Sequence, residues 1–249
     1  MRILSWFSCG AASAVATKLT IESGREVLPV YCETGAEHKD NERFLADCEK
    51  WFGTYVYRLK SEKFEDTWDV WERRKYLAGI DGAPCTVELK IHPRLSFQKP
   101  DDIHVFGYTA DKADIIRANR LRLNYPELRI ETPLITAGLT KESVIAMIER
   151  ANIAPPPMYA LGFQNNNCIP CVKATSASYW ALVRKCFPKE FERMVELSRR
   201  LDVRLARLGD ERIFIDQIPE DHPTTSPITP SCDFLCHLAE MGLGENYEI

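Results

Sequence analysis

The feature that most constrains the fold is the alternation, through residues 1–150, of short apolar runs with helical patterns. Residues 3–8, 27–31, 54–59 and 103–107 are predicted to be strands, and a fifth short strand falls within residues 129–134. Strands that alternate with helices are typical of strand–helix–strand units, whose strands pair in parallel. The sequence therefore predicts an α/β fold: a Rossmann-like parallel five-stranded sheet with helices on both faces.

The pattern changes after the prolines at residues 155–157. A polar loop with two cysteines follows, then two helices within residues 176–200 that are separated at Pro188, and then an extended segment at 221–230 that is rich in Pro, Thr and Ser. We therefore predict two units. Residues 1–155 form the sheet domain, and residues 156–249 form a mainly helical, cysteine-bearing extension packed on it.

Charge and cysteine content exclude several classes of protein. The formal net charge of -4 disfavours a protein that coats nucleic acid. No apolar run approaches the roughly 20 residues of a membrane helix, and the apolar stretch at residues 3–7 is too short for an export signal. We expect a cytoplasmic protein without a membrane partner. Nine cysteines in a reducing compartment indicate metal ligation, redox chemistry or buried thiols.

The candidate phosphate loop (residues 8–13) lies between the first strand and a helix predicted to begin at Ser13. Free backbone N–H groups and the positive end of a helix meet at such a position, which suits an anion. Small residues let the anion approach the backbone, and two serines add hydroxyl donors. An ordinary tight turn is the alternative. The residues of the loop are Ser8, Cys9, Gly10, Ala11, Ala12 and Ser13.

Several motifs occur in an order that resembles a known family. After the loop come Glu33-Thr34-Gly35, then Cys85 with Leu89-Lys90, then Gly107-Tyr108 before an arginine-rich helix, and then Asn166-Asn167-Cys168-x-x-Cys171. Together they resemble the phosphoadenosine phosphosulfate (PAPS) reductase-like family of the PP-loop ATP pyrophosphatase superfamily. Cys9 and Ala12 depart from the usual Ser-Gly-Gly-x-Asp-Ser loop, and Glu33 stands where an aspartate is usual.

The resemblance implies an adenine nucleotide, ATP or PAPS, as the bound ligand. It assigns nucleotide contacts to the candidate phosphate loop, to Glu33, Thr34 and Gly35, and to Gly107. Lys90 and Arg117 are the cations expected to contact phosphate or sulfate oxygens during catalysis.

Cys168 and Cys171 have the spacing of a pair that holds one metal or cluster. A redox dithiol, a zinc knuckle and two incidental thiols are the alternatives. Cys85 is the expected third ligand. The resemblance implies a [4Fe-4S] cluster, with zinc as the alternative metal, and Cys232 or Cys236 as fourth ligand unless one iron stays open.

Cys236 has a second interpretation as a catalytic nucleophile beside His237, because cluster-free PAPS reductases carry such a cysteine in a C-terminal segment. The surrounding residues match that segment poorly. A tail helix that buries Cys236 is the alternative.

Three functions are left open. The leading one is ATP-dependent adenylylation coupled to sulfur transfer, with an unidentified acceptor, for which a nucleobase is one candidate, and a thiol or cysteine desulfurase as sulfur donor. The second is a sulfonucleotide reductase that releases sulfite. The third is a catalytically degenerate nucleotide sensor or interaction protein. A homodimer is also left open.

Overall fold

A parallel sheet of five strands forms the centre of the computed structural model, which describes all residues except 80–81, 232–238 and 240–249. The strand order is β3-β2-β1-β4-β5. All four pairings are parallel, with Ile3 of β1 in register with Val27 of β2 and with Ile103 of β4. The predicted fold is confirmed. The strands are β1 (Ile3–Trp6), β2 (Val27–Cys32), β3 (Tyr57–Leu59), β4 (Ile103–Val105) and β5 (Arg129–Glu131).

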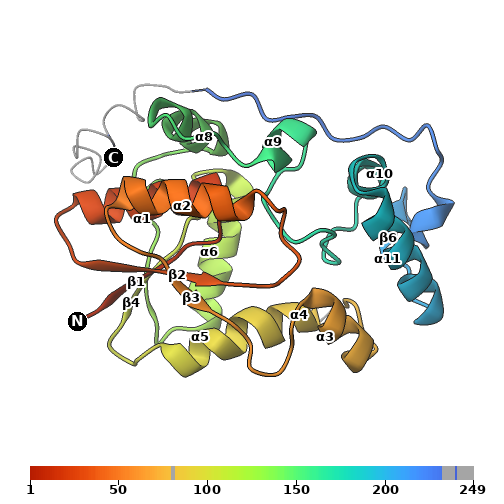
Figure 1. The fold of residues 1–249 in the computed structure, drawn as a ribbon, viewed down its shortest axis with the longest axis horizontal. Coiled ribbons are helices and arrows are strands. Elements are labelled where there is room, and N and C mark those ends of the chain that lie inside the picture. Colours follow the sequence, from red (N-terminus) through yellow and green to blue (C-terminus); the bar gives the residue numbers. More distant parts are fainter. Residues whose placement is uncertain (80–81, 232–238, 240–249) are drawn as a thin grey trace.

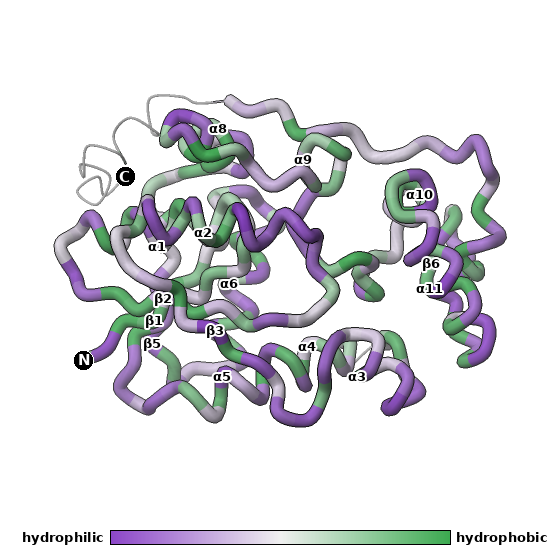
Figure 2. The backbone as a smooth tube through the Cα atoms, in the orientation of Figure 1, coloured by the Kyte–Doolittle hydropathy of each residue, from purple (hydrophilic) through white to green (hydrophobic). Residues whose placement is uncertain are grey.

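Helices cover both faces of this sheet (Figure 1). One face carries α1 (Ala11–Glu22), α2 (Asn41–Phe52) and α8 (Lys141–Arg150), and the other carries α5 (His92–Phe97) and α6 (Lys112–Asn124). Such an arrangement follows from right-handed crossovers that run outward from β1 in both directions. Hydrophobic residues concentrate on the central strands β1 and β2 (Figure 2).

The chain between β3 and β4 contains helices whose bounds do not follow from the sequence pattern. They are α3 (Thr67–Arg74), α4 (Pro84–Thr86) and a π-helix η1 (Val87–Ile91) that continues into α5. Trp68 and Trp71 of α3 pack in one hydrophobic cluster with Trp180, whereas α1, α2 and α8 bury a separate cluster against the sheet.

The C-terminal extension contains α9 (Pro157–Leu161), α10 (Ala177–Cys186) and α11 (Pro188–Arg200). It also contains an antiparallel pair, β6 (Ala206–Leu208) and β7 (Glu211–Ile213), followed by the short helix η2 (Ile215–Gln217). The segment after η2 returns across α9 towards α8 (Figure 1), where the Thr225 hydroxyl donates to the Gly162 carbonyl at 2.8 Å. The remaining short helix is α7 (Pro133–Thr136).

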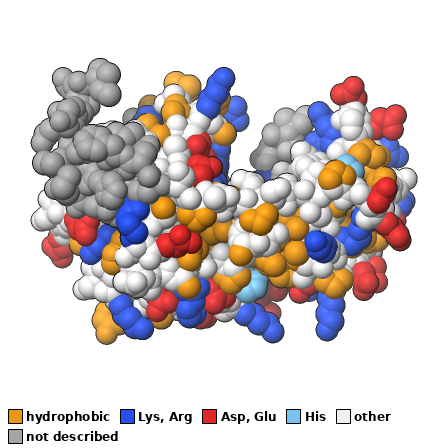
Figure 3. All heavy atoms as spheres, turned by 90° about the horizontal axis from the view of Figure 1, so that it is seen from above, with side chains coloured by type: hydrophobic (Ala, Val, Ile, Leu, Met, Phe, Trp, Pro, Cys, Tyr) orange, Lys and Arg blue, Asp and Glu red, His pale blue; other side chains and the backbone are white. Residues whose placement is uncertain are grey.

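Two general surface properties bear on function. Among the described helices, none has the length and apolar character that crossing a membrane requires. Basic and acidic side chains are intermixed on the face drawn in Figure 3, with hydrophobic side chains between them. This face therefore does not present a single-sign surface for a polyanion.

Candidate functional site

The candidate phosphate loop turns tightly between β1 and α1. Cys9 has a left-handed backbone with φ of 55°, and α1 begins at Ala11, two residues before the predicted start. The Ser13 hydroxyl donates to the Gly10 carbonyl at 3.0 Å and accepts from the Ser8 N–H at 3.0 Å. Ser13 therefore braces the loop from inside.

Backbone donors remain available at this turn. Within the described part of the chain, the N–H groups of Gly10, Ala12 and Ser13 have no hydrogen-bond acceptor, whereas that of Ala11 donates to the Tyr159 hydroxyl at 3.1 Å. N–H groups in the first turn of a helix have no acceptor within that helix. Together with the helix dipole, they can bind phosphate oxygens.

Gly107 brings the loop after β4 against the first turn of α1. A Cβ atom at Gly107 would lie 2.6 Å from the backbone nitrogen and Cα of Ser13, so only glycine fits. Strands β2 and β3 lie on one side of β1, and β4 and β5 lie on the other, so the strand order reverses direction between β1 and β4. Open α/β sheets bind ligands beyond the carboxyl ends of the strands at such a switch point. The structure places the candidate phosphate loop and Gly107 there.

Residues 33–35 follow β2 at the same edge of the sheet. The Thr34 N–H and hydroxyl both donate to Glu37, at 2.8 and 2.5 Å. Glu33 pairs with Lys60 at 2.6 Å and with Arg58 at 3.3 Å. The acid that orders this turn is therefore Glu37, which the sequence analysis does not identify.

A surface groove of about 700 Å³ opens beside this turn, at the carboxyl ends of β2 and β3. Its charges nearly balance, which suits an uncharged part of a ligand better than a phosphate. The charged lining residues are Glu33, Glu62, Glu65, Asp69, Lys60, Lys63 and Arg73.

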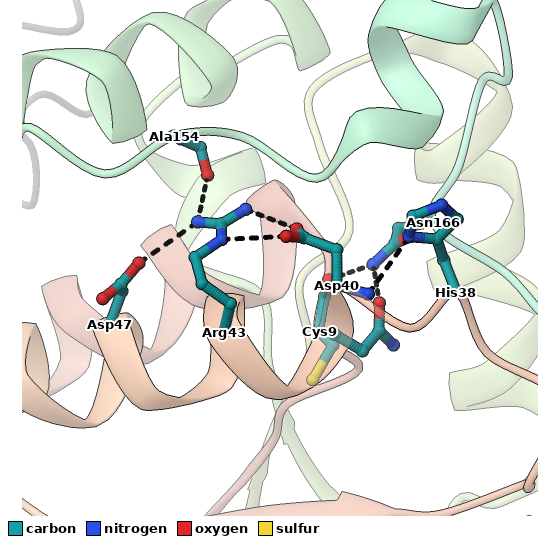
Figure 4. Close-up of polar contacts among 8 residues, drawn as sticks. Cys9, His38, Asp40, Arg43, Asp47, Ala154 and Asn166 are labelled. Carbon is teal, nitrogen blue, oxygen red and sulfur yellow. Dashed lines mark hydrogen bonds and ion pairs between the residues drawn. The ribbon is translucent and has the colours of Figure 1, made fainter.

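Asn166 connects the C-terminal extension to the candidate phosphate loop. Its side-chain amide donates to the Cys9 carbonyl at 2.6 Å and to Asn41 Oδ1 at 2.8 Å (Figure 4). In the same view Arg43 of α2 bonds to Asp40, Asp47 and the Ala154 carbonyl, which fixes α2 against the chain before α9. Asn166 belongs to the Asn166-Asn167-Cys168-x-x-Cys171 motif, but the sequence alone indicates no role for its side chain.

Cys168, two residues after Asn166, contacts the turn formed by residues 33–35. Its Sγ is 2.9 Å from the Thr34 hydroxyl, and the next N–H, of Ile169, donates to the Ala36 carbonyl at 2.7 Å. The Cys171 N–H donates to the Tyr179 hydroxyl at 2.7 Å. These contacts place the two-cysteine segment at the same edge of the sheet as the candidate phosphate loop.

Lys90 of η1 interacts electrostatically with Glu37 and with several thiols. We call Lys90, Glu37, Cys32, Cys168 and Cys171 the Lys90 cluster. Lys90 is exposed, yet the surrounding chain removes part of its hydration, which lowers its pKa. The attraction of the thiolate forms of the cysteines and of Glu37 outweighs this effect, so the net direction of the Lys90 pKa is upward.

Burial controls the thiols of this cluster. It raises the pKa of Cys168 to about 11, and that of Cys32 likewise to about 11, while the Lys90 charge acts in the opposite direction on both. Both residues are therefore thiols at neutral pH. Lys90 favours the ionisation of both thiols, and it is joined by Arg94 at Cys32 and by the Thr34 hydroxyl at Cys168.

The described residues do not form the predicted metal site. No group of three or more His, Cys, Asp or Glu side chains within residues 1–79 and 82–231 is arranged to hold a metal ion. Cys85 lies against Trp71, and burial raises the pKa of its thiol, whereas Cys168 contacts Thr34. The expected cluster or zinc site on Cys85, Cys168 and Cys171 is thus not supported. The expected ligand Cys232 and the expected nucleophile Cys236 lie outside the described residues.

Two further cations lie near the loop after β4. Arg117 is exposed, pairs with Asp114 at 2.8 Å and lies 5.5 Å from the ring centre of Tyr108. Lys141, which the sequence analysis does not single out, begins α8 and donates to the Gln164 carbonyl at 2.9 Å. Burial lowers the pKa of Lys141.

Comparison with known proteins shows a similarity of fold. No family model matches the sequence, and no curated protein matches it. The structure is similar to a crystal structure of phosphoadenylyl-sulfate (PAPS) reductase from Candida auris in a phosphate complex. The TM-score is 0.50 at 12% sequence identity, over 68% of this chain and 81% of that chain. The chain therefore has a PAPS reductase-like fold.

Proposed function

We propose that this chain is an adenine-nucleotide-dependent enzyme of the PAPS reductase-like family that couples ATP-dependent adenylylation to sulfur transfer. The observation that carries the proposal is the junction of an anion-binding loop with a group of thiols. Asn166 holds the Cys9 carbonyl of the candidate phosphate loop, and Cys168, two residues later, contacts Thr34.

The nucleotide is proposed to lie across the carboxyl edge of the sheet. Its phosphates would accept from the N–H groups of Gly10, Ala12 and Ser13, which lie in the loop after β1, beside the switch point between β1 and β4. Its ribose and base would lie towards the groove beside Glu33 and Gly35. The PAPS reductase of similar fold is itself described as a phosphate complex.

The proposed chemistry has two displacements. An oxygen of the acceptor attacks the α-phosphorus of ATP, the bond to the bridging oxygen breaks, and pyrophosphate leaves. A sulfur nucleophile then attacks the acceptor carbon that bears this oxygen, and AMP leaves with the oxygen. Lys90 favours the thiolate form of Cys168, which would take the outer sulfur of an external persulfide donor, whose thiol then leaves. This outer sulfur would be the nucleophile of the second displacement. The Cys171 thiol would then attack Cys168 Sγ, release the thiocarbonyl product and form a Cys168–Cys171 disulfide, which an external dithiol would reduce. A nucleobase carbonyl is a suitable acceptor for both steps.

A second candidate is a sulfonucleotide reductase, which the fold similarity favours. A thiolate would attack the sulfur of PAPS or adenylyl sulfate, the nucleotide would leave, and a second thiol would release sulfite and form a disulfide. An external dithiol reductant would restore the two thiols. Cys168 and Cys171, or Cys236 of the tail, are the thiols for this reaction.

Calorimetric titration with ATP, PAPS and adenylyl sulfate separates the candidates. The leading proposal expects ATP to bind and pyrophosphate to appear once the acceptor is added. Tight PAPS binding without ATP binding would overturn it in favour of the reductase. Sulfite release that survives the double change Cys232→Ser and Cys236→Ser would exclude the tail as nucleophile. Nucleotide binding without turnover of any substrate would favour the third function, a catalytically degenerate nucleotide sensor or interaction protein.

A further inference from the structure

Helix α6 exposes most of its surface. Only Ala118 is buried among its 13 residues, and the apolar residues Ile116 and Leu123 are 51% and 81% exposed. With about 3.6 residues per turn, all of its exposed residues fall on one side, which we call the outer face of α6. These residues are Lys112, Ala113, Ile116, Arg117, Asn119, Arg120, Leu123 and Asn124.

The outer face of α6 carries charge of one sign. It presents Lys112, Arg117 and Arg120 and contains no acidic side chain. Arg117 pairs at 2.8 Å with Asp114, which lies on the flank of the helix, whereas Lys112 and Arg120 form no ion pair within the described part of the chain. The exposed residues of α11, by contrast, mix acidic with basic side chains. A surface with unpaired charges of one sign attracts a partner of the opposite charge.

The outer face of α6 begins beside the candidate site. The loop before α6 contains Gly107, whose backbone packs against Ser13 of the candidate phosphate loop. The Arg117 guanidinium carbon lies 5.5 Å from the ring centre of Tyr108 in the same loop. Because β4 and β5 are parallel, α6 runs back from the carboxyl edge of the sheet to its amino edge, on the face opposite α1 (Figure 1). A long ligand on this face therefore reaches the candidate site at one end.

We infer that the outer face of α6 binds a single-stranded polynucleotide and that this strand presents the acceptor base to the candidate site. The identity of the strand as acceptor rests on the proposed function, in which a nucleobase is the acceptor. A single strand is favoured because a base must leave the stack before an enzyme modifies it. Its phosphates suit the three cations, and the two asparagines are further donors to phosphate or base. An acidic polypeptide matches the charge but supplies no base.

The length of the face predicts how many nucleotides it contacts. Lys112 and Arg120 are separated by about 12 Å along the helix axis, at about 1.5 Å per residue. A stacked strand advances about 3.4 Å per nucleotide, so the three cations span about three or four phosphates. Each neutralised phosphate of a single strand contributes about -0.7 to the slope of log affinity against log salt. Three cations therefore predict a slope of about -2.

The test is fluorescence anisotropy of short fluorescein-labelled RNA and DNA strands of mixed sequence, titrated without ATP over a range of KCl concentrations. We expect saturable binding of at least one strand with the predicted slope. The double change Lys112→Gln and Arg120→Gln removes two of the three cations, so it should weaken binding about ten-fold and reduce the slope by about 1.4. Lys185→Gln with Lys189→Gln, at exposed positions of α10 and α11, is the matched control and should change neither quantity.

Three results would overturn the inference. The first is that neither strand binds, or that the double change in α6 leaves strand binding as it was. The second is an equal loss of binding in the control, which would assign the attraction to the overall charge of the protein. The third is displacement of the strand by poly-glutamate at equal charge concentration, which would assign the face to an acidic polypeptide. None of these results affects ATP binding or the proposed function.

Calorimetry with ATP on the same α6 variant separates the docking surface from the nucleotide site. The Kd for ATP should equal that of the unchanged protein. The KM for the strand in acceptor-dependent pyrophosphate release should rise with little change in kcat, because the lost contacts only bind substrate. Weaker ATP binding in the variant would contradict a separate surface. Strand binding that depends on α6, in a protein that binds no ATP, would instead overturn the proposed function and support the docking surface.

Discussion

Gly107 allows the backbone after β4 to touch the first turn of α1. Gly107→Ala would place a Cβ 2.6 Å from Ser13 backbone atoms, so the two segments must separate. We expect a loss of about 1–3 kcal/mol in the free energy of unfolding and a marked loss of ATP affinity, measured by denaturant unfolding and calorimetry. Gly53→Ala is the control, because it also strains the backbone, with φ of 70°, but meets no atom within 4 Å. Equal ATP affinity in both variants would contradict the placement of the nucleotide.

The role of Asn166 can be tested by a substitution that removes its two side-chain hydrogen bonds. Asn166→Ala leaves the Cys9 carbonyl and Asn41 Oδ1 without this donor, which should cost about 1–3 kcal/mol of stability and weaken ATP binding. Asn167→Ala, at an exposed neighbouring position, should leave both quantities unchanged. If Asn167→Ala has the larger effect on calorimetric affinity, Asn166 does not organise the loop.

Cys32 gives a prediction for pH. Burial raises its pKa from 9.0 to about 11, so the folded chain holds this proton more tightly than the unfolded chain. The corresponding stability is present below about pH 9 and is lost as the pH rises towards 11. Alkylation by iodoacetamide should accelerate over the same range, read by mass spectrometry on tryptic peptide 26–39, whose single cysteine is Cys32. Lys90→Met should move the midpoint upward, and a downward shift would contradict the placement of Lys90.

The sequence indicates the residues of the site better than their partners. Thr34, Lys90, Cys168 and the candidate phosphate loop are all named by local motifs, and the structure brings them to one edge of the sheet. Glu37 and Lys141 stand in no recognisable motif, and their contacts depend on the folded chain. The expected metal site is the opposite case. The spacing of Cys168 and Cys171 predicts a shared metal, but it does not reveal that Thr34 contacts Cys168 and that Tyr179 accepts from the Cys171 N–H in the folded chain.

At the scale of elements, α8 carries a cap that both sequence and structure identify. The Thr140 hydroxyl accepts from the Ser143 N–H at 3.3 Å at the start of the helix. Thr140→Ala should lower the free energy of unfolding by about 1 kcal/mol. Thr136→Ala, at an exposed position on α7, is the control for loss of a threonine side chain. A cost no greater than this control in urea unfolding would show that the cap is not stabilising.

The limits of sequence prediction are also clear among the elements. The five strands and their parallel pairing follow from apolar runs separated by helical patterns. The start of α1 does not follow from the sequence pattern, because the Ala11 N–H donates to the hydroxyl of Tyr159, 148 residues away. Strands β6 and β7 have only three residues each, which is too few to establish an alternating pattern in the sequence.

At the scale of the whole molecule, the candidate site connects two hydrophobic clusters. The first lies between the sheet and α1, α2 and α8, and the second joins α3 to α10 and α11. Asn166 reaches the loop of the first cluster, while Ile169 and Val172 of the same segment are buried in the second. A ligand at the candidate phosphate loop should therefore stabilise both.

Hydrogen exchange with and without ATP tests this coupling. At a ligand concentration of about 100 times Kd, binding adds about 2.7 kcal/mol to global stability. Amides of α1 and of residues 166–172 should gain protection together, because Asn166 transmits the constraint from one cluster to the other. Adenosine, which lacks phosphates, is the control and should protect neither segment to the same degree. Protection confined to α1 in the unchanged protein, or coupled protection that persists in Asn166→Ala, would show that the two clusters respond to the nucleotide independently of this contact.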